Sequence, residues 1–408
     1  MTVDTPAPDP LAPAELGPVR LRNRVIKAAT YEGLSHRGRV TRDLLDFHLA
    51  YARGGVGMTT VAYCAVSADG RTDKHQIHWT DEALPGLRTL TEAVHAEGAA
   101  VSAQIGHAGP VADPRSAGRH ALAPSSRLTA TMTRTHAIDR AGIERVVRAH
   151  AQAARRAIEC GFDAVEVHLG HNYLLSSFLS PRLNRRDDEY GGSLENRARF
   201  PRQVLRAVRE AVGDRIAVLV KLNMDDGVPG GFWLDEAIGV AQWLEADGTC
   251  DALEMTAGSS LENPMYLFKG DAPLEEFAAV MPQPIRLGVK LVGRRFIRAY
   301  PYRDAYLLQH ARQVRAAVDL PMVLLGGIVD RASMDLAMST GFDYVAMGRA
   351  LLRKPDLVNR IAADASTPSL CIHCNKCMPT NFTGTRCVLV DRGTTRRDTW
   401  GTPAGYVG

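Results

Sequence analysis

The stretch that decides the fold reads Ala164-Val165-Glu166-Val167-His168-Leu169-Gly170-His171-Asn172-Tyr173. It begins as an apolar, β-branched strand and ends in a glycine turn that carries two imidazoles, His168 and His171, and the phenol of Tyr173. Downstream, Ser193-Leu194-Glu195-Asn196 is typical of a helix start. In a barrel of alternating strands and helices, catalytic groups gather at the carboxyl ends of the strands. The stretch therefore predicts a strand, a functional loop and a helix, in that order.

The same alternation of extended and helical patterns runs through the chain. Short apolar runs, typical of parallel strands covered on both faces, lie at 24–29, 58–65, 100–105, 164–167, 216–222, 252–256, 322–325 and 344–347. Helical patterns alternate with them, at 43–53, 84–98, 143–160, 199–212, 234–246 and 302–318. This order predicts an α/β protein with a single (β/α)8 TIM barrel. A doubly wound sheet is a weaker alternative because no Gly-x-Gly-x-x-Gly follows the first strand.

Composition excludes several classes of protein. The 408 residues are 45% hydrophobic and 23% charged, which is ordinary for a globular chain with a large core. The 49 Lys and Arg residues nearly balance the 45 Asp and Glu residues, so we expect neither a nucleic acid nor a membrane surface as a partner. Residues 1–13 lack the basic start and apolar run of a secretory signal, and no segment reaches the roughly 20 apolar residues of a membrane helix. We therefore expect a cytoplasmic protein.

Three regions are predicted. Residues 1–15 are rich in Pro and Ala and predict a disordered lead-in, residues 16–360 predict the barrel, and residues 361–408 predict a short cysteine-rich C-terminal extension. The long segment 257–303 after the sixth strand exceeds the usual connection of roughly 2 to 6 residues, so we expect it to lie over the barrel mouth. Its apolar part, Met265-Tyr266-Leu267-Phe268, is a candidate pocket lining. Its basic residues are candidates for an anionic ligand or donor, or for a solvated surface: Lys290, Arg294, Arg295, Arg298 and Arg303.

Polar groups at other strand ends are candidate ligands of a bound heterocycle. Gln104 closes the third strand, where its amide offers a donor and an acceptor, either to a ligand or to local backbone. Lys221 lies within an apolar strand, where a buried cation requires an anionic partner. Glycines and an arginine follow the last two strands, where barrels commonly bind phosphate: Gly326, Gly327, Gly348 and Arg349.

These motifs, in this order, resemble those of the old yellow enzyme family of NADH:flavin oxidoreductases. The resemblance runs from residue 16 to about residue 352 and implies that the barrel binds FMN, with NADH or NADPH as electron donor. It implies that Gln104 binds the flavin pyrimidine edge and that Lys221 lies beside flavin N1 and O2, where most relatives carry Arg. It also assigns three residues after the first strand to the cofactor, although relatives usually have Thr or Cys in place of the last: Ala28, Thr30 and Tyr31.

The resemblance further implies a reaction. His168 and His171 would hold the carbonyl or nitro oxygen of an activated alkene, such as an enone, enoate or nitroalkene, while flavin N5 delivers hydride. Tyr173 would deliver the proton, since a phenol with a pKa of about 10 is protonated at neutral pH. One alternative is a flavin and iron–sulfur dehydrogenase or reductase that exchanges electrons with a one-electron partner. An alternative from another class is a non-catalytic flavin- or metal-binding electron-transfer scaffold.

Four of the seven cysteines crowd near the C-terminus: Cys371, Cys374, Cys377 and Cys387. With a slightly shorter gap before the fourth, their spacing resembles the [4Fe-4S] segments of 2,4-dienoyl-CoA reductase and trimethylamine dehydrogenase. Zinc suits four thiolates as well, and thiols that bind no metal are the third alternative. A cluster would imply a ferredoxin-like electron donor as partner. A homo-oligomer is also left open.

Overall fold

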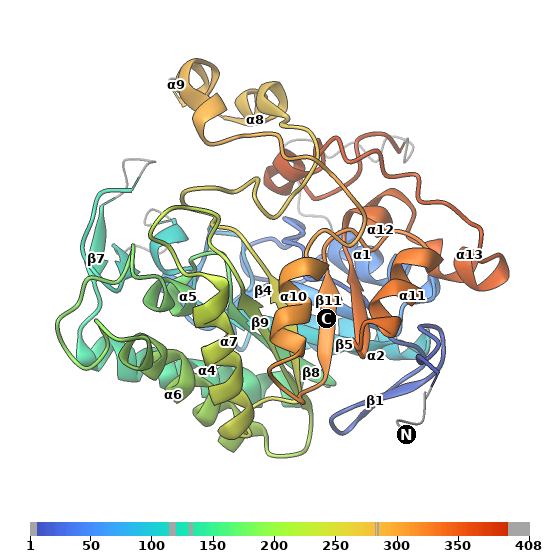
Figure 1. The fold of residues 1–408 in the computed structure, drawn as a ribbon, viewed down its shortest axis with the longest axis horizontal. Helices are drawn as coiled ribbons and strands as arrows, with labels where there is room; N and C mark the ends of the chain where they lie inside the picture. Colours follow the sequence, from blue (N-terminus) through green and yellow to red (C-terminus); the bar gives the residue numbers. More distant parts are fainter. Residues whose placement is uncertain (1–5, 114–119, 130–133, 282, 284, 391–408) are drawn as a thin grey trace.

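The computed structural model describes residues 6–113, 120–129, 134–281, 283 and 285–390. Its centre is a closed barrel of eight parallel strands, in which each strand pairs with the next one of the barrel along the chain (Figure 1). The strands are β3 (Val25–Lys27), β4 (Met58–Ala65), β5 (Ala100–Gly106), β8 (Ala164–Leu169), β9 (Ala217–Asn223), β10 (Ala252–Thr256), β11 (Met322–Leu325) and β12 (Tyr344–Met347). The predicted (β/α)8 barrel is confirmed, and strand bounds differ from the prediction by at most a few residues.

Helices surround the barrel because their apolar faces bury against the outer faces of the strands. They include α1 (Arg42–Arg53), α2 (Leu84–Ala96), α4 (Arg140–Glu159), α5 (Leu174–Leu179), α6 (Leu194–Val212), α7 (Leu234–Ala246), α10 (Leu308–Arg315), α11 (Arg331–Ser339), α12 (Arg349–Arg353) and α13 (Leu357–Ala363). The predicted start of α6 is confirmed, since the Ser193 hydroxyl accepts a hydrogen bond from Asn196 N at 3.3 Å. No helix in the described part of the chain is long and apolar enough to cross a membrane.

A hairpin closes the amino-terminal end of the barrel. β1 (Ala14–Leu16) and β2 (Val19–Leu21) pair antiparallel, and Leu16 and Leu21 are buried. They pack against inward-facing residues at the strand starts, among them Ile26, Met58, Ala164, Ala217, Ala252, Val323 and Tyr344. The lead-in expected to be disordered over residues 1–15 is ordered at its end, because β1 begins at Ala14 and burial of Leu16 holds it in place. Residues 1–5 lie outside the described part.

The helix predicted over 302–318 is wrong in its first part. The structure has α10 only from Leu308 to Arg315. Ala305 adopts a left-handed φ of 48°, and its N–H donates to the carbonyl of Gly327 at 3.0 Å instead of to a helical carbonyl. Tertiary pairing with the loop after β11 thus overrides local helix propensity.

Two long connecting segments contain short elements. The segment over 106–141 carries β6 (Ala121–Ala123) and β7 (Thr135–Ala137), which pair in parallel. The segment over 257–303 carries α8 (Leu274–Val280) and α9 (Ile285–Val292), which project from one end of the molecule in Figure 1.

The cysteine-rich extension packs on the segment 257–303. The amide of Asn375 donates to the carbonyls of Phe268 at 2.8 Å and Asp271 at 2.9 Å. Lys376 forms an ion pair of 2.8 Å with Glu276. These contacts hold both segments over the carboxyl-terminal end of the barrel.

Candidate active site

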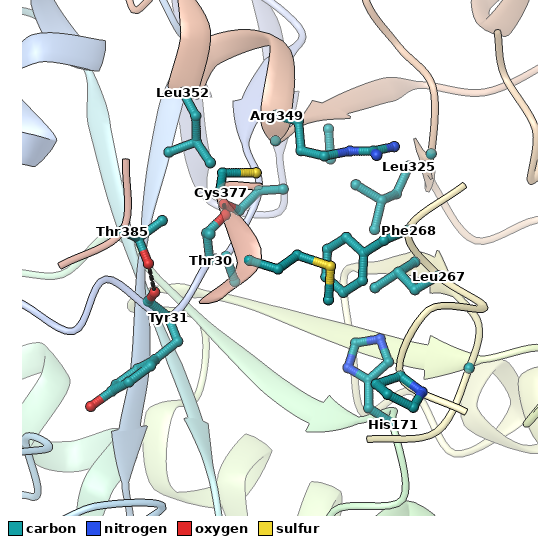
Figure 2. A pocket seen from close by; sticks show the side chains of 18 of the residues that line it. Thr30, Tyr31, His171, Leu267, Phe268, Leu325, Arg349, Leu352, Cys377 and Thr385 are labelled. Carbon is teal, nitrogen blue, oxygen red and sulfur yellow. Dashed lines mark hydrogen bonds between the residues drawn. The ribbon is translucent and has the colours of Figure 1, made fainter. Parts of the chain in front are cut away.

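A cavity of about 360 Å³ opens at the carboxyl ends of the strands (Figure 2). Its wall combines strand ends with the segment 257–303, represented by Leu267 and Phe268, and the C-terminal extension, represented by Cys377. The structure brings to this one cavity every catalytic and cofactor residue proposed from the sequence: Ala28, Thr30, Tyr31, Gln104, His168, His171, Tyr173, Lys221, Gly326, Gly327, Gly348 and Arg349. Of the other two apolar candidates, Met265 is fully buried and Tyr266 donates its hydroxyl to Asp225.

His168, His171 and Tyr173 form one wall of the cavity. Nε2 of His168 and Nδ1 of His171 form a hydrogen bond of 3.3 Å with each other, so the two nitrogens lie side by side. The ring of Tyr173 stands edge-on to that of His168, with centroids 4.7 Å apart. His171 is held from behind by Thr256, whose hydroxyl lies 2.9 Å from Nε2.

Burial fixes the protonation states of this wall. It lowers the pKa of His168 well below its usual value and that of His171 to about 3, and the charge of Lys221 acts in the same direction on both. Burial also raises the pKa of Tyr173 to about 12. At neutral pH the site therefore presents two uncharged imidazoles and a protonated phenol.

The loop that carries these groups has an unusual backbone. His171 and Asn172 both have left-handed φ angles, 59° and 58°, a region that few residues other than Gly, Asn, Asp and His adopt. The amide of Asn172 donates to Asp226 Oδ1 at 3.0 Å, and His171 N donates to Asn223 Oδ1 at 3.4 Å. The loop after β9 therefore holds the loop after β8 in this conformation.

Lys221 has the anionic partners that its buried position requires. Its Nζ lies 3.1 Å from Glu166 Oε1 and in close contact with Glu254 Oε1, and all three side chains are at most 2% exposed. Gln104, a candidate flavin ligand, donates its side-chain amide to Glu166 Oε1 at 2.5 Å. Its amide nitrogen is therefore bound to the same glutamate that pairs with Lys221. Neither Glu166 nor Glu254 was proposed from the sequence. A signal existed for Glu166, because residues two apart on a strand face the same side and His168 follows it by two.

The candidate cofactor residues that follow the first strand, Thr30 and Tyr31, form hydrogen bonds with other residues of the protein. The hydroxyl of Tyr31 donates to Asp73, and Figure 2 shows its ring pointing away from His171 and Leu325. The hydroxyl of Thr30 donates to the carbonyl of Ala28 at 3.1 Å and lies 3.1 Å from Lys27 Nζ. Tyr31 therefore presents its backbone, and not its phenol, to the cavity.

The glycine loops provide close backbone approach. Gly326 and Gly327 have φ angles of 97° and 83°, and a Cβ on either would lie 2.7 Å from a neighbouring atom, of Leu307 and of Ala305 respectively. A Cβ on Gly348 would meet nothing within 4 Å, so its backbone is open to a ligand. Arg349 donates to the carbonyl of Lys269 at 2.7 Å and to the side chain of Asn375.

These residues fit a flat, anionic cofactor. The cavity supplies an amide from Gln104, a cation from Lys221, and glycine backbone beside Arg349 where a phosphate can bind. Such a set suits FMN.

Two of the four C-terminal cysteines belong to the cavity wall. Cys371 and Cys377 line the cavity, while all four proposed ligands are partly buried. Burial raises the pKa of Cys377 to about 12, and Arg349 opposes that rise. Among the described residues, no three His, Cys, Asp or Glu side chains are grouped so as to hold a metal ion, so the thiols as placed do not fit a single zinc. The charges of the other three thiols all act on the pKa of Cys377, so the four cysteines lie near one another.

The fold and site define a flavin-binding barrel oxidoreductase. The model of the "NADH:flavin oxidoreductase / NADH oxidase family" matches residues 11–261. The chain belongs to this family, and it is an FMN-dependent oxidoreductase that uses a reduced nicotinamide nucleotide. The prediction of the family, the cofactor and the enzyme class from the sequence is confirmed.

Individual relatives differ in length and in name. The chain is 53% identical over 387 residues to a 4,4'-dithiodibutanoate disulfide reductase of Rhodococcus erythropolis, covering 95% of this chain and 96% of that one. A 2-naphthoyl-CoA reductase in complex with 2-naphthoyl-CoA has the same fold, with a TM-score of 0.77 and 24% identity over 90% of this chain. This chain spans 54% of that longer protein. The old yellow enzyme homologue from Zymomonas mobilis has a TM-score of 0.70 and 22% identity, covering 90% of this chain and 96% of that one.

Proposed function

We propose that the protein reduces an activated carbon–carbon double bond, in an enone, enoate or nitroalkene, with Tyr173 as proton donor. The observation that carries this proposal is the pairing of two neutral imidazoles with a protonated phenol on one wall of the cavity. Bound FMN supplies hydride transfer between the nicotinamide nucleotide and the substrate. Gln104, Lys221, Gly326, Gly327, Gly348 and Arg349 would hold it, with backbone contacts from Ala28, Thr30 and Tyr31.

The protein side chains act on the substrate at two atoms. His168 Nε2 and His171 Nδ1 bind the substrate oxygen and stabilise the negative charge that develops there, which a buried site does more strongly than water. Tyr173 then transfers its phenolic proton to the α-carbon. The aromatic contact with Tyr63, 5.3 Å between centroids, orients the Tyr173 ring for this step.

The experiment is a two-step stopped-flow measurement on the holoenzyme with 2-cyclohexenone. Tyr173→Phe should leave reduction of the flavin by the nicotinamide nucleotide unchanged and slow its reoxidation by the enone by about 10²-fold or more. His168→Ala should weaken enone binding. Unchanged reoxidation in both variants would exclude the proposal and favour a scaffold that acts in electron transfer.

The relative from Rhodococcus erythropolis favours a second candidate reaction, reduction of an organic disulfide. One hydride and one proton cleave a sulfur–sulfur bond into two thiols, so the same proton donor serves both reactions. Assays with 4,4'-dithiodibutanoate, followed by thiol release, distinguish the candidates. Thiol release without turnover of any enone or nitroalkene would select the disulfide reaction.

The cysteine segment supports a further proposal on electron supply. Cys371, Cys374, Cys377 and Cys387 would hold a [4Fe-4S] cluster next to the cavity, with a ferredoxin-like donor as external partner.

A further inference from the structure

Three buried charged side chains meet inside the barrel below the cavity. Glu166, Lys221 and Glu254 come from the adjacent strands β8, β9 and β10, and Glu254 is paired in register with Lys221. Lys221 contacts Oε1 of both glutamates. Oε2 of Glu166 and Oε2 of Glu254 are both buried and have no hydrogen-bond partner. Two carboxylate oxygens without donors are costly in a protein interior.

The charges of this group do not balance if both carboxyls are ionised. Two carboxylates and one ammonium leave one uncompensated negative charge. Lys27 is a further cation near the group, but it lies against the rings of Phe47 and Tyr51, and the charge of Glu32 acts on it more strongly than that of Glu254. Burial lowers the pKa of Lys27 to about 8. The titratable groups that interact with the three from neighbouring elements are Lys27, His168 and His171, while Glu32 acts on Lys27 and contacts His48.

One proton bound between the two carboxyls resolves both problems. It gives an orphaned Oε2 a donor and brings the group of three to zero net charge. The direction of the pKa of Glu254 agrees, since burial and the neighbouring Glu166 raise it to about 8. The ammonium of Lys221 stays charged, because the attraction of both glutamates outweighs burial and raises its pKa.

We propose that Glu166 and Glu254 share one proton beneath Lys221, and that this proton exchanges with solvent when the bound flavin gains or loses charge. The proposal rests on the proposed function in one respect, since it needs the flavin beside Lys221. Two-electron reduction of the bound flavin would add negative charge beside Lys221, so the carboxyl pair would hold its proton more tightly. In alkaline solution reduction then draws one proton from water onto the pair, forming one O–H bond, and reoxidation returns it.

The test is the midpoint potential of the bound FMN, measured by spectral titration from pH 6 to pH 10. Glu254→Gln should fold, because the amide has the shape and charge of a protonated glutamate. In the wild type, one extra proton per two electrons should steepen the fall of the potential with pH above about pH 8. Glu254→Gln should lack this steeper part and match the wild type near pH 6. The control, Glu92→Gln on the exposed face of α2, should follow the wild type throughout.

A second measurement does not depend on the flavin. Infrared spectra of the apoprotein should show a protonated carboxyl band that disappears as pH rises through about 8 in the wild type and is absent in Glu254→Gln. Parallel potential curves for the wild type and Glu254→Gln would overturn the proposal, as would the absence of the infrared band in the wild type at pH 6. Failure of the proposed function appears differently, as absent enone turnover with these pH effects intact.

Discussion

The carboxylate of Asp226 accepts the amide of Asn172 at 3.0 Å and the amide of Asn223 at 2.8 Å on the same oxygen, Oδ1. Its other oxygen accepts Phe232 N at 2.9 Å. This one buried side chain therefore joins the two loops that position His171 and Tyr173.

Asp226→Ala should destabilise the protein and disorder the catalytic loop. It leaves two buried donors, Asn172 Nδ2 and Phe232 N, without an acceptor, each costing about 1 to 3 kcal/mol, while Asn223 keeps its hydrogen bond to Gly258 O at 3.0 Å. It also removes what holds the left-handed residues His171 and Asn172 in place. Denaturant unfolding measures the loss of stability, and enone or disulfide turnover measures the loss of activity. Asp187→Ala, at an exposed position close to the site loops in sequence, is the matched control. Equal unfolding midpoints for the two variants would contradict this reading.

The proton-donating step should be insensitive to pH over the neutral range. Burial raises the pKa of Tyr173 to about 12, so the phenol keeps its proton as pH rises from 6 to 10. Reoxidation of the reduced enzyme by substrate, measured by stopped flow, should therefore show no loss attributable to a titrating acid up to about pH 10. A fall centred near pH 7 would identify another group as the acid.

Glu254 should make stability depend on pH. Its folded-state pKa of about 8 lies above the ordinary value of 4.5, so the folded state binds this proton more tightly. The resulting stabilisation is fully present below about pH 4.5 and is lost as pH rises to about 8. The melting temperature of the wild type, relative to Glu254→Gln, should therefore fall between pH 5 and pH 8. A constant difference across that range would show that the carboxyl does not titrate there.

Removing the buried cation should cost more than removing one carboxylate. Lys221→Met leaves the charge of two buried glutamates without its partner, and breaking a buried pair in this way costs about 3 to 5 kcal/mol. Above about pH 8, where both carboxyls are ionised, adding Glu254→Gln to Lys221→Met should recover part of the loss, because it removes one of the two repelling charges. Chemical denaturation of the two variants and of Lys221→Arg, which keeps the charge, measures these differences. If the double variant lost as much unfolding free energy as Lys221→Met and Glu254→Gln together, the side chains would not be coupled.

The absorption spectrum of protein purified without oxygen should reveal the state of the cysteines. A [4Fe-4S] cluster adds a broad band, bleached by dithionite, to the resolved flavin bands. Cys377→Ala should remove that band and leave the flavin bands. Cys250→Ala, a buried cysteine outside the cavity, should change neither. Flavin bands alone in the wild type would leave the thiols without a cluster.

The barrel could be predicted from sequence because its signals are local. Each strand is a run of mainly apolar residues buried on both faces, and this pattern separates strand from helix without knowledge of partners. The site loop was found in the same way, since His168, His171 and Tyr173 lie within six residues of each other at one strand end. The helix predicted over 302–318 failed where the N–H of Ala305 pairs with Gly327, a contact 22 residues away along the chain.

The sequence by itself thus determined the barrel, the family and the residues that gather at its mouth, because strand order places every strand's carboxyl end at one rim. Only the tertiary structure decided what those residues contact. Lys221 gained its two glutamates from the neighbouring strands β8 and β10, and the phenol of Tyr31 turned to Asp73. The physical reason is that burial and pairing, which fix charge and protonation, depend on side chains that are distant in sequence and meet only when the barrel closes.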